Sequence, residues 1–208
     1  MSIIIQKFGG SSVADTEKLF NVCKYIKKEL DLGNKVVAVV SAQGKLTDKL
    51  LNDSKEISEN PSKRELDVLA SLGEQVTIAK LSMCLHKLNI KAISLTGWQV
   101  PIITDSNFTD AMIEKIDVSR INKELEDGKV VVVAGFQGID SNNDITTLGR
   151  GGSDTTAVGL AAFLNAKRCE IYTDVDRSIY CRSKGRNNGK ENKAHILWWY
   201  VNSCKSWC

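Results

Sequence analysis

Along residues 1–176, short runs of apolar, mostly β-branched residues alternate with longer amphipathic stretches. The runs have the length and composition of buried strands, and the amphipathic stretches repeat apolar residues at helical spacing. We expect strands near residues 2–8, 35–41, 91–96, 100–104, 130–134 and 169–173, and helices near residues 12–31, 45–56, 62–88, 109–113, 118–126 and 153–165.

This alternation predicts an α/β fold with three layers, in which helices cover both faces of a mostly parallel sheet. Ligands of such sheets bind beyond the carboxyl ends of the strands. Lys7, Ser41, Arg150 and Thr173 each lie at or just after the end of an apolar run. We therefore expect these four residues on one rim of the sheet.

The segment LGRGGSDTTA at 148–157 combines an arginine, glycines, a serine and an aspartate in one turn before a predicted helix. A glycine turn lets the backbone approach a ligand, and the N–H groups at a helix start attract anions. Arg150 adds a fork that fits a carboxylate or a phosphate. The simpler interpretation is a loop followed by an ordinary helix cap at Ser153 or Asp154.

A second segment of this kind, IIIQKFGGSS at 3–12, places Lys7 beside Gly9 and Gly10. A point charge and exposed amides suit a phosphate chain. Neither the Walker A pattern nor the Rossmann glycine pattern is present in the segment. A plain strand, turn and helix would explain the same residues.

Two further segments combine polar residues with close backbone packing. The loop SAQGKLTD at 41–48 follows a buried run, and SLGEQ at 71–75 lies within a helical stretch. A glycine inside a helix costs about 1 kcal/mol relative to alanine, so Gly73 indicates a close approach of another backbone. Glu74 is a candidate binding carboxylate, although a solvated helix face would also account for it.

Together these segments resemble the catalytic domain of aspartate kinases, in the amino-acid-kinase family. They follow the family's order and cover nearly all of residues 1–176; Ser11, Gln43 and the pair Asn107-Phe108 depart from the usual pattern without removing a charged group. The matching segments are KFGGSS at 7–12, VVSAQGKLTD at 39–48, SLGEQ at 71–75, TGWQVPIITD at 96–105, VVVAGFQGID at 131–140, LGRGGSDTTA at 148–157 and YTDVD at 172–176.

The resemblance implies a carbamate-kinase-like fold that is incomplete at its C-terminus. It also implies transfer of the γ-phosphoryl group of ATP, with Mg²⁺, to the side-chain carboxylate of L-aspartate. The product is 4-phospho-L-aspartate, at the first step of lysine, threonine and methionine biosynthesis. The accepting carboxylate is already ionised at pH 7, so the reaction needs no general base. Catalysis then consists of aligning two anions and neutralising the developing charge.

The resemblance also assigns residues to roles. Lys7, Arg150 and Asp154 are the implied catalytic residues, and no residue is assigned as a metal ligand. Asp154 is expected to orient Lys7 or the metal shell, and Glu74 to receive the substrate ammonium. The implied ATP-binding residues are Lys7, Phe8, Gly9, Gly10, Ser41, Ser153, Thr173 and Asp174, and the implied aspartate-binding residues are Thr47, Glu74, Arg150, Gly151, Gly152 and Ser153.

Composition bounds these expectations. The chain has 208 residues and a formal net charge of +3, with six cysteines and two histidines. Irregularly spaced cysteines indicate reduced thiols in the cytoplasm, and so few histidines argue against a histidine nucleophile or a histidine-rich zinc site. We expect neither a signal peptide, a membrane span nor a nucleic-acid partner. The full-length family is expected to form homo-oligomers; the state of this chain is left open.

The sequence changes character after Asp176. Residues 177–208 hold seven of the basic residues against one acid, and three of the four tryptophans. The family continues here with DVDG[VI]YTADPR, whereas this chain has DVDRSIYCRSKGR. We expect a non-family tail that is disordered or out of frame. A one-base insertion at codon 177 would explain it, since dropping one base there can restore a G-V-F-I-A-D-P-R segment. Binding of nucleic acid or of a membrane surface by the tail is a weaker alternative.

Three functions therefore stay open at this stage. The first is aspartate kinase activity. The second is a catalytically inactive remnant that at most binds aspartate through Glu74 and Arg150. The third is a kinase for another small amino acid such as glutamate, which SLGEQ and RGGSDTTA fit less well than they fit the aspartate enzymes.

Overall fold

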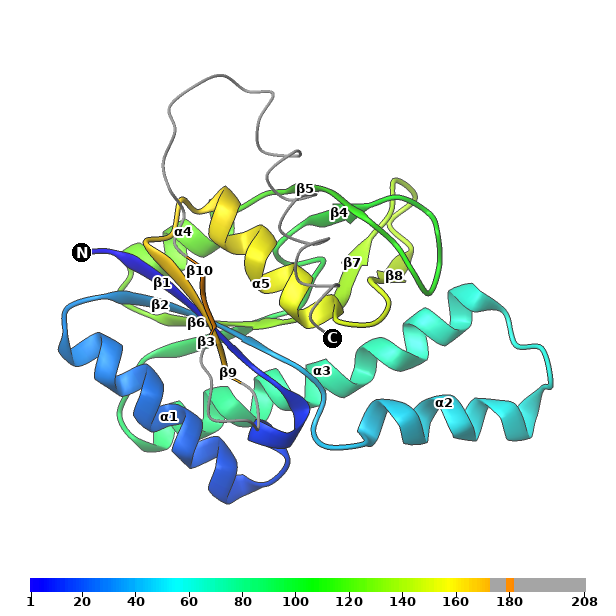
Figure 1. Cartoon of the computed structure of the whole chain (residues 1–208), viewed down its shortest axis with the longest axis horizontal. Coiled ribbons are helices and arrows are strands. Elements are labelled where there is room, and N and C mark those ends of the chain that lie inside the picture. Colours follow the sequence, from blue (N-terminus) through cyan, green and yellow to red (C-terminus); the bar gives the residue numbers. More distant parts are fainter. Residues whose placement is uncertain (173–178, 182–208) are drawn as a thin grey trace.

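The computed structural model of the chain describes residues 1–172 and the backbone of residues 179–181. Its layers can be followed in Figure 1. In chain order, the elements are β1 (Ile3–Phe8), the 3-10 helix η1 (Gly10–Val13), α1 (Thr16–Asp31), β2 (Lys35–Val40), α2 (Leu46–Ile57), α3 (Lys63–Lys87), β3 (Ala92–Leu95), β4 (Ile102–Thr104), β5 (Ile113–Ile116), α4 (Ser119–Glu126), β6 (Val130–Ala134), β7 (Gln137–Ile139), β8 (Ile145–Thr147), α5 (Gly152–Phe163), β9 (Arg168–Tyr172) and β10 (Ile179–Cys181).

Six strands form the main sheet in the order β10-β9-β1-β2-β6-β3. The pairs from β9 to β3 are parallel, and only β10 runs antiparallel, beside β9. The mostly parallel sheet of the predicted α/β fold is thus confirmed. Because β1, β2 and β6 are neighbours and parallel, their carboxyl ends meet at one edge.

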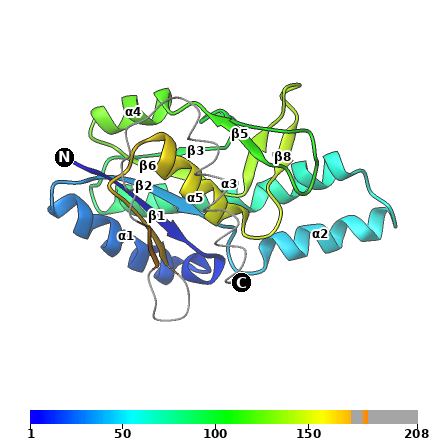
Figure 2. The same cartoon turned by 45° about the horizontal axis from the view of Figure 1, so that its top comes forward.

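Helices cover both faces of this sheet, with α1 and α3 on one side and α4 and α5 on the other (Figures 1 and 2). Alternate residues of β2 and β6 enter the two cores, as the period of two along a strand requires. Val37 and Val39 pack towards α4 and α5, whereas Val36 and Val40 pack towards α1 and α3. Burying each such side chain contributes roughly 1.5–3 kcal/mol, so this double core holds the site's framework.

A second, smaller sheet lies beside the first, with the order β5-β4-β7-β8 and mostly antiparallel pairing. The sequence analysis placed the run 100–104 in a single sheet, whereas its strand β4 belongs to this second sheet. Strands β5, β7 and β8 were not expected. All four are three or four residues long, which is too short for a clear period.

The predicted helix at 109–113 is wrong, because Ile113–Ile116 forms β5 and the preceding residues form a turn. Their N–H groups bond to groups distant in sequence: that of Thr109 to the Asp67 carboxylate and that of Ala111 to the Thr147 carbonyl. Thr109 also has a φ of 74°, outside the helical region. Tertiary hydrogen bonds therefore replace the expected i−4 bonds.

The predicted helix at 12–31 is divided in two. The 3-10 helix η1 ends at Val13, and α1 begins at Thr16 after Asp15. The Asp15 carboxylate accepts a hydrogen bond of 2.9 Å from the N–H of Lys18, which is a side-chain N-cap. The N-terminal glycine turn is therefore separate from the helix that follows it.

Among the described residues, only α3 is long and apolar enough to cross a membrane by length and composition. Its buried residues are mixed, however, because Asp67, Ser71, Glu74 and Thr77 are buried as well as apolar residues of its C-terminal half. The helix contacts α1, β3, β6 and β8, so its apolar residues serve the protein core. Within the described residues, Cys23 and Cys84 are buried free thiols.

Three residues of the region predicted as a non-family tail form β10. The remainder of that region lies outside the described residues, and the predicted boundary at residue 176 stays a prediction.

Candidate active site

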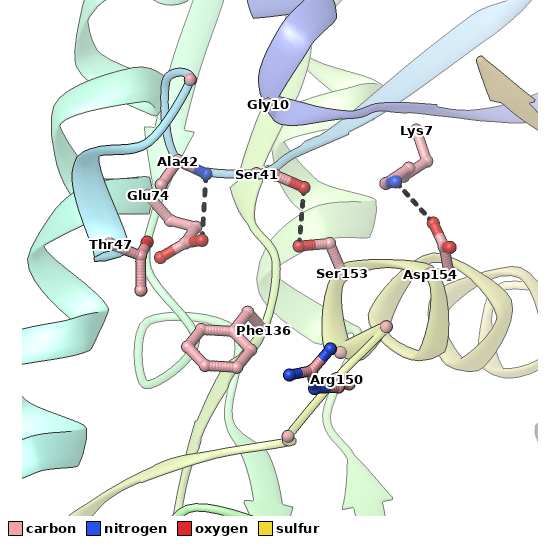
Figure 3. Close-up of a pocket in the computed structure, with 14 residues that line it drawn as sticks. Lys7, Gly10, Ser41, Ala42, Thr47, Glu74, Phe136, Arg150, Ser153 and Asp154 are labelled. Carbon is pink, nitrogen blue, oxygen red and sulfur yellow. Dashed lines mark hydrogen bonds and ion pairs between the residues drawn. The ribbon is translucent and has the colours of Figure 1, made fainter. Parts of the chain in front are cut away.

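A cavity of about 370 Å³ opens at the carboxyl ends of β1, β2 and β6, beside the N-terminus of α5 (Figure 3). The sequence-based rule for ligand sites in α/β sheets places a site at this edge. The cavity is lined by Lys7, Gly10, Ser41, Ala42, Gly44, Thr47, Glu74, Phe136, Gly149, Arg150, Gly151, Gly152, Ser153 and Asp154. Five segments that are separated in the sequence thus meet around one space.

Lys7 and Asp154 form an ion pair across the cavity, with 2.7 Å between Nζ and a carboxylate oxygen. Lys7 comes from β1, and its side chain is 10% exposed; Asp154 stands in the first turn of α5. A carboxylate in the first turn is stabilised by the positive end of the helix dipole. Asp154 was expected to orient Lys7 or the metal shell, and its contact with Lys7 has the geometry for the first of these roles.

A second polar contact, between two hydroxyl groups, spans the cavity next to the ion pair. The Ser41 hydroxyl, at the end of β2, donates to the Ser153 hydroxyl at 2.9 Å. Gly135 allows this approach, since a Cβ added there would lie 2.7 Å from Cβ of Ser153. The two hydroxyls can each turn towards a ligand oxygen when one is present.

Glu74 is the most unusual group in the cavity. It is 3% exposed, and its Oε1 accepts a hydrogen bond of 2.9 Å from the N–H of Ala42. Its Oε2 is buried and has no hydrogen-bond partner among the described residues. Burial raises the pKa of the Glu74 carboxyl to about 7, and the Ala42 hydrogen bond only partly opposes this. A buried, half-satisfied carboxylate can be neutralised by a bound cation.

Gly73 brings α3 against the loop that carries Ala42 and against the first turn of α2, which carries Thr47. A Cβ at position 73 would lie 2.6 Å from Cβ of Ala42 and 3.0 Å from Oγ1 of Thr47. The close approach expected from a glycine inside a helix is thus confirmed. It places the Thr47 hydroxyl and the Glu74 carboxylate on the same wall of the cavity (Figure 3).

Arg150 occupies the turn between β8 and α5. Gly149 and Gly151 flank it with φ values of 69° and 72°, which an L-residue adopts only under strain. Among the described residues, no carboxylate forms an ion pair with Arg150, whose guanidinium therefore has free donors. The turn presents a fork of N–H donors and the first amides of α5 to the same space.

Most of the predicted site residues line this cavity: Lys7, Gly10, Ser41, Thr47, Glu74, Arg150, Gly151, Gly152, Ser153 and Asp154. Phe8 does not, because its side chain is 1% exposed and stacks on Tyr172 at 4.8 Å on the other face of the sheet. Gly9 lies next to the cavity, its Cβ position being 3.6 Å from Nζ of Lys7. Thr173 and Asp174 lie outside the described residues.

The sequence analysis missed Phe136, which lies between Glu74 and Arg150 in the cavity wall (Figure 3). Its φ is 69°, a strained value for an aromatic residue. The N–H of Phe136 donates a hydrogen bond to the Thr156 hydroxyl, and the carbonyl of Phe136 accepts one from the N–H of Leu148. Its place directly after a buried strand and Gly135 was an available indication. Ala42, Gly44 and Gly149 were also missed, and they contribute mainly backbone.

The residues present bear on whether a metal ion fits. Within the described part of the chain, no group of three or more histidine, cysteine or acidic side chains could hold one. Among the residues that the structure describes, Asp154 is the one carboxylate that pairs with Lys7. A magnesium ion here would therefore take most of its oxygens from phosphates and water, as this ion commonly does.

Comparison with known proteins gives matches over most of the chain. The amino acid kinase family model matches residues 2–188. An aspartokinase from Geobacillus stearothermophilus is 56% identical over 175 residues, which are 84% of this chain and 43% of that protein. The crystal structure of aspartate kinase from Synechocystis has a TM-score of 0.72 at 49% identity, and covers 84% of this chain and 28% of that chain.

The structure of E. coli aspartokinase III in complex with aspartate and ADP has a TM-score of 0.73 at 25% identity, over 83% of this chain and 49% of that chain. The chain spans 43% of the length of the curated relatives it matches. The family model nevertheless covers the whole described fold, including every residue that lines the cavity. The chain therefore belongs to the amino acid kinase family.

Proposed function

We propose that the cavity binds L-aspartate and ATP and transfers the γ-phosphoryl group of ATP to the side-chain carboxylate of aspartate. The observation that carries the proposal is the buried, unpartnered Oε2 of Glu74 in a cavity that also contains Lys7 and the N-terminus of α5. One end thus attracts a cation and the other attracts anions. An amino acid and a phosphate chain together need both ends.

The end formed by Glu74, Thr47 and Arg150 suits the amino acid. Glu74 would hold the ammonium group, since a cation within hydrogen-bond distance offsets the cost of burying the carboxylate. Arg150 would hold a carboxylate through a forked pair of hydrogen bonds, and the amides of Gly151 and Gly152 would support it. The names of the relatives, which are aspartokinases, favour aspartate as the amino acid.

The end formed by Lys7, Gly10, Ser41 and Ser153 suits the phosphates. The Lys7 ammonium is held 2.7 Å from Asp154, and it can follow charge that develops on the transferred group. Two hydroxyls and the first turn of α5 supply further donors. A magnesium ion would screen the negative charge of the phosphates, with Asp154 as the available protein carboxylate.

In the proposed reaction, an oxygen of the aspartate side-chain carboxylate forms a bond to the γ-phosphorus. The bond from that phosphorus to the β,γ-bridging oxygen breaks, and its electron pair leaves with ADP. No proton is abstracted, because the attacking carboxylate is already ionised. The protein's task is to align the two anions and to neutralise the charge between them.

The proposal is tested by incubating the chain with ATP, Mg²⁺, L-aspartate and hydroxylamine, which traps an acyl phosphate as a coloured hydroxamate. Product should require both ATP and aspartate, and replacing aspartate by glutamate should give little. Product from glutamate alone would assign another amino acid. Calorimetric binding of aspartate without any product would show a protein that only binds the amino acid. The absence of both binding and product would contradict the proposal.

We further propose that this reaction serves lysine, threonine and methionine biosynthesis in the cytoplasm. The proposal rests on the names of the relatives and on the buried free thiols of Cys23 and Cys84.

Oligomerisation of the chain is testable by light scattering, and a homo-oligomer is the expected outcome for the full-length family.

A further inference from the structure

Asp67 is a buried carboxylate that lies outside the cavity. It is 1% exposed and projects from α3 towards the second sheet. Its Oδ2 accepts hydrogen bonds from the N–H groups of Thr109, at 3.0 Å, and Thr147, at 2.9 Å. Its Oδ1 accepts a third, of 2.7 Å, from the Thr147 hydroxyl. One side chain thus joins a helix to a turn and to the end of a strand.

These three donors match what an ionised carboxylate accepts. Burial raises the pKa of the Asp67 carboxyl, and the hydrogen bonds from Thr147 and Thr109 oppose that rise. A neutral asparagine has one acceptor oxygen and cannot accept three such bonds from the same positions. The site is therefore built for a carboxylate that organises backbone, and it leaves no open position for a ligand.

The residues held by Asp67 lead directly to Arg150. Thr147 ends β8, three residues before Arg150, and Thr109 has a strained φ of 74°. Asp110, which follows Thr109, packs against Gly149: a Cβ added at Gly149 would lie 2.4 Å from Oδ1 of Asp110. Asp67 thus fixes both sides of the contact that precedes the Arg150 turn.

Asp67 and Glu74 share one face of the same helix. Seven residues separate them, which is close to two turns and about 10 Å along the axis. Glu74 faces the cavity directly, whereas Asp67 reaches the cavity through the turn that bears Arg150. The straight segment of α3 between them is therefore a rigid connection between the two ends of the proposed amino-acid site.

We propose that Asp67 is a positioning residue that fixes the distance between Glu74 and Arg150, and thereby selects an amino acid with the chain length of aspartate. The inference rests on the proposed function, because it assigns the ammonium to Glu74 and a carboxylate to Arg150. It adds that the preference for aspartate over glutamate depends on a residue that touches neither.

The test compares dissociation constants for L-aspartate and L-glutamate, measured by calorimetry on the wild-type chain and on Asp67→Asn. The variant should bind aspartate about tenfold more weakly or worse, because a buried donor loses its acceptor and the Arg150 turn shifts. Glutamate should be affected less, so the preference for aspartate should fall. Binding of ADP at the Lys7 end should stay as in the wild type.

Asp144→Asn is the matched control. Asp144 accepts two hydrogen bonds from Arg64, of 3.0 and 2.7 Å, and so also joins α3 to the β7–β8 hairpin. That contact is solvent-accessible and lies at the start of β8, away from the end that precedes the Arg150 turn. Its loss should leave the preference between the two amino acids unchanged.

Thr147→Val is the second variant, and it decides the matter if Asp67→Asn does not fold. It removes only the hydroxyl bond to Oδ1 of Asp67 and should produce a smaller loss of the same preference. A folded variant at either position with the wild-type ratio of affinities would overturn the inference, as would equal weakening of aspartate and glutamate. A wild-type chain that binds neither amino acid would overturn the proposed function as well, which distinguishes the two failures.

Discussion

The two ends of the cavity differ in how their charges are balanced. At the Lys7 end, polar groups pair with each other: Lys7 with Asp154, and Ser41 with Ser153. At the Glu74 end, one carboxylate oxygen is buried without a described partner, and Arg150 pairs with no described carboxylate. The first end is complete without a ligand, whereas the second is not.

This difference implies different energetic roles. A ligand at the Lys7 end exchanges one set of hydrogen bonds for another, so the gain is expected where charge develops during the reaction. A ligand at the Glu74 end supplies the cation that a buried carboxylate lacks, so the gain is expected in binding. Substitutions at the two ends should therefore change different kinetic constants.

The largest effect is expected from Lys7→Ala. It should lower kcat by roughly 10²–10³-fold with little change in KM for aspartate, because the ammonium acts mainly on charge in the transition state. Steady-state rates in the hydroxamate assay measure both constants. Lys49→Ala, at an exposed lysine of α2, is the control and should be silent.

The double variant Lys7→Ala/Asp154→Asn tests whether the loss of kcat comes only from leaving Asp154 without its partner. The kcat of the double variant should be as low as that of Lys7→Ala. Recovery of kcat in the double variant, or a raised KM with normal kcat in Lys7→Ala, would contradict the assignment.

Glu74→Gln should have the next largest effect, and it should act on binding. Affinity for aspartate should fall about 10- to 100-fold, since a neutral amide cannot pair with the ammonium group. At pH 8 the free energy of unfolding should rise, because the variant no longer buries a carboxylate. Calorimetry and chemical denaturation measure the two quantities, and Glu65→Gln, at an exposed position of α3, is the control.

The pH dependence follows from the pKa of Glu74, which the fold raises to about 7 from an ordinary value near 4.5. The folded state then binds more protons than the unfolded state between these values, so stability should fall as pH rises from about 4.5 to about 7 and then level off. Aspartate affinity should change in the opposite direction, weakening about tenfold per pH unit below 7.

Proton release measures this directly. Binding of aspartate near pH 7 should release a fraction of a proton, detected by calorimetry in buffers of different ionisation enthalpy. Glu74→Gln should abolish the release. Binding that releases no proton in the wild type would show that Glu74 is already ionised in the free protein.

The smallest effect is expected from Ser41→Ala, which removes the hydroxyl pair with Ser153. One hydrogen bond between neutral groups contributes about 0.5–1.5 kcal/mol, so kcat/KM should fall only a few-fold. A loss as large as that of Lys7→Ala would show that the two contacts at this end are not separable.

The sequence predicted the main sheet well and the second sheet poorly. Runs such as Val130–Ala134 are long, β-branched and buried on both faces, so their composition alone identifies a strand. Strands such as β7, with the sequence Gln-Gly-Ile, carry no such pattern and exist because neighbouring strands pair with them. The wrong helix at 109–113 has the same cause, since its N–H groups bond to Asp67 and to Thr147.

The site shows the same division. Lys7 and Ser41 could be predicted because each lies at the end of a β-branched run, and Arg150 because it stands in a glycine turn before a helix. Glu74 could be predicted because a charged residue adjoins Gly73 in a helix. For Phe136 the sequence offered only its position after a strand and Gly135, since its place depends on hydrogen bonds to Leu148 and Thr156. Sequence spacing therefore identifies the polar residues at strand ends, whereas residues that hold loops in place are identified only in the three-dimensional structure.

Gly73 has a consequence for how this protein can vary. It lies in the middle of α3, where alanine would favour the helix by about 1 kcal/mol, yet a methyl group there would collide with Ala42. A saturation library at this codon should thus retain glycine alone under selection for ligand binding. The glycine lowers the intrinsic stability of the helix but lets the helix backbone approach Ala42. Substitutions that stabilise this domain by raising helix propensity must therefore leave position 73 unchanged.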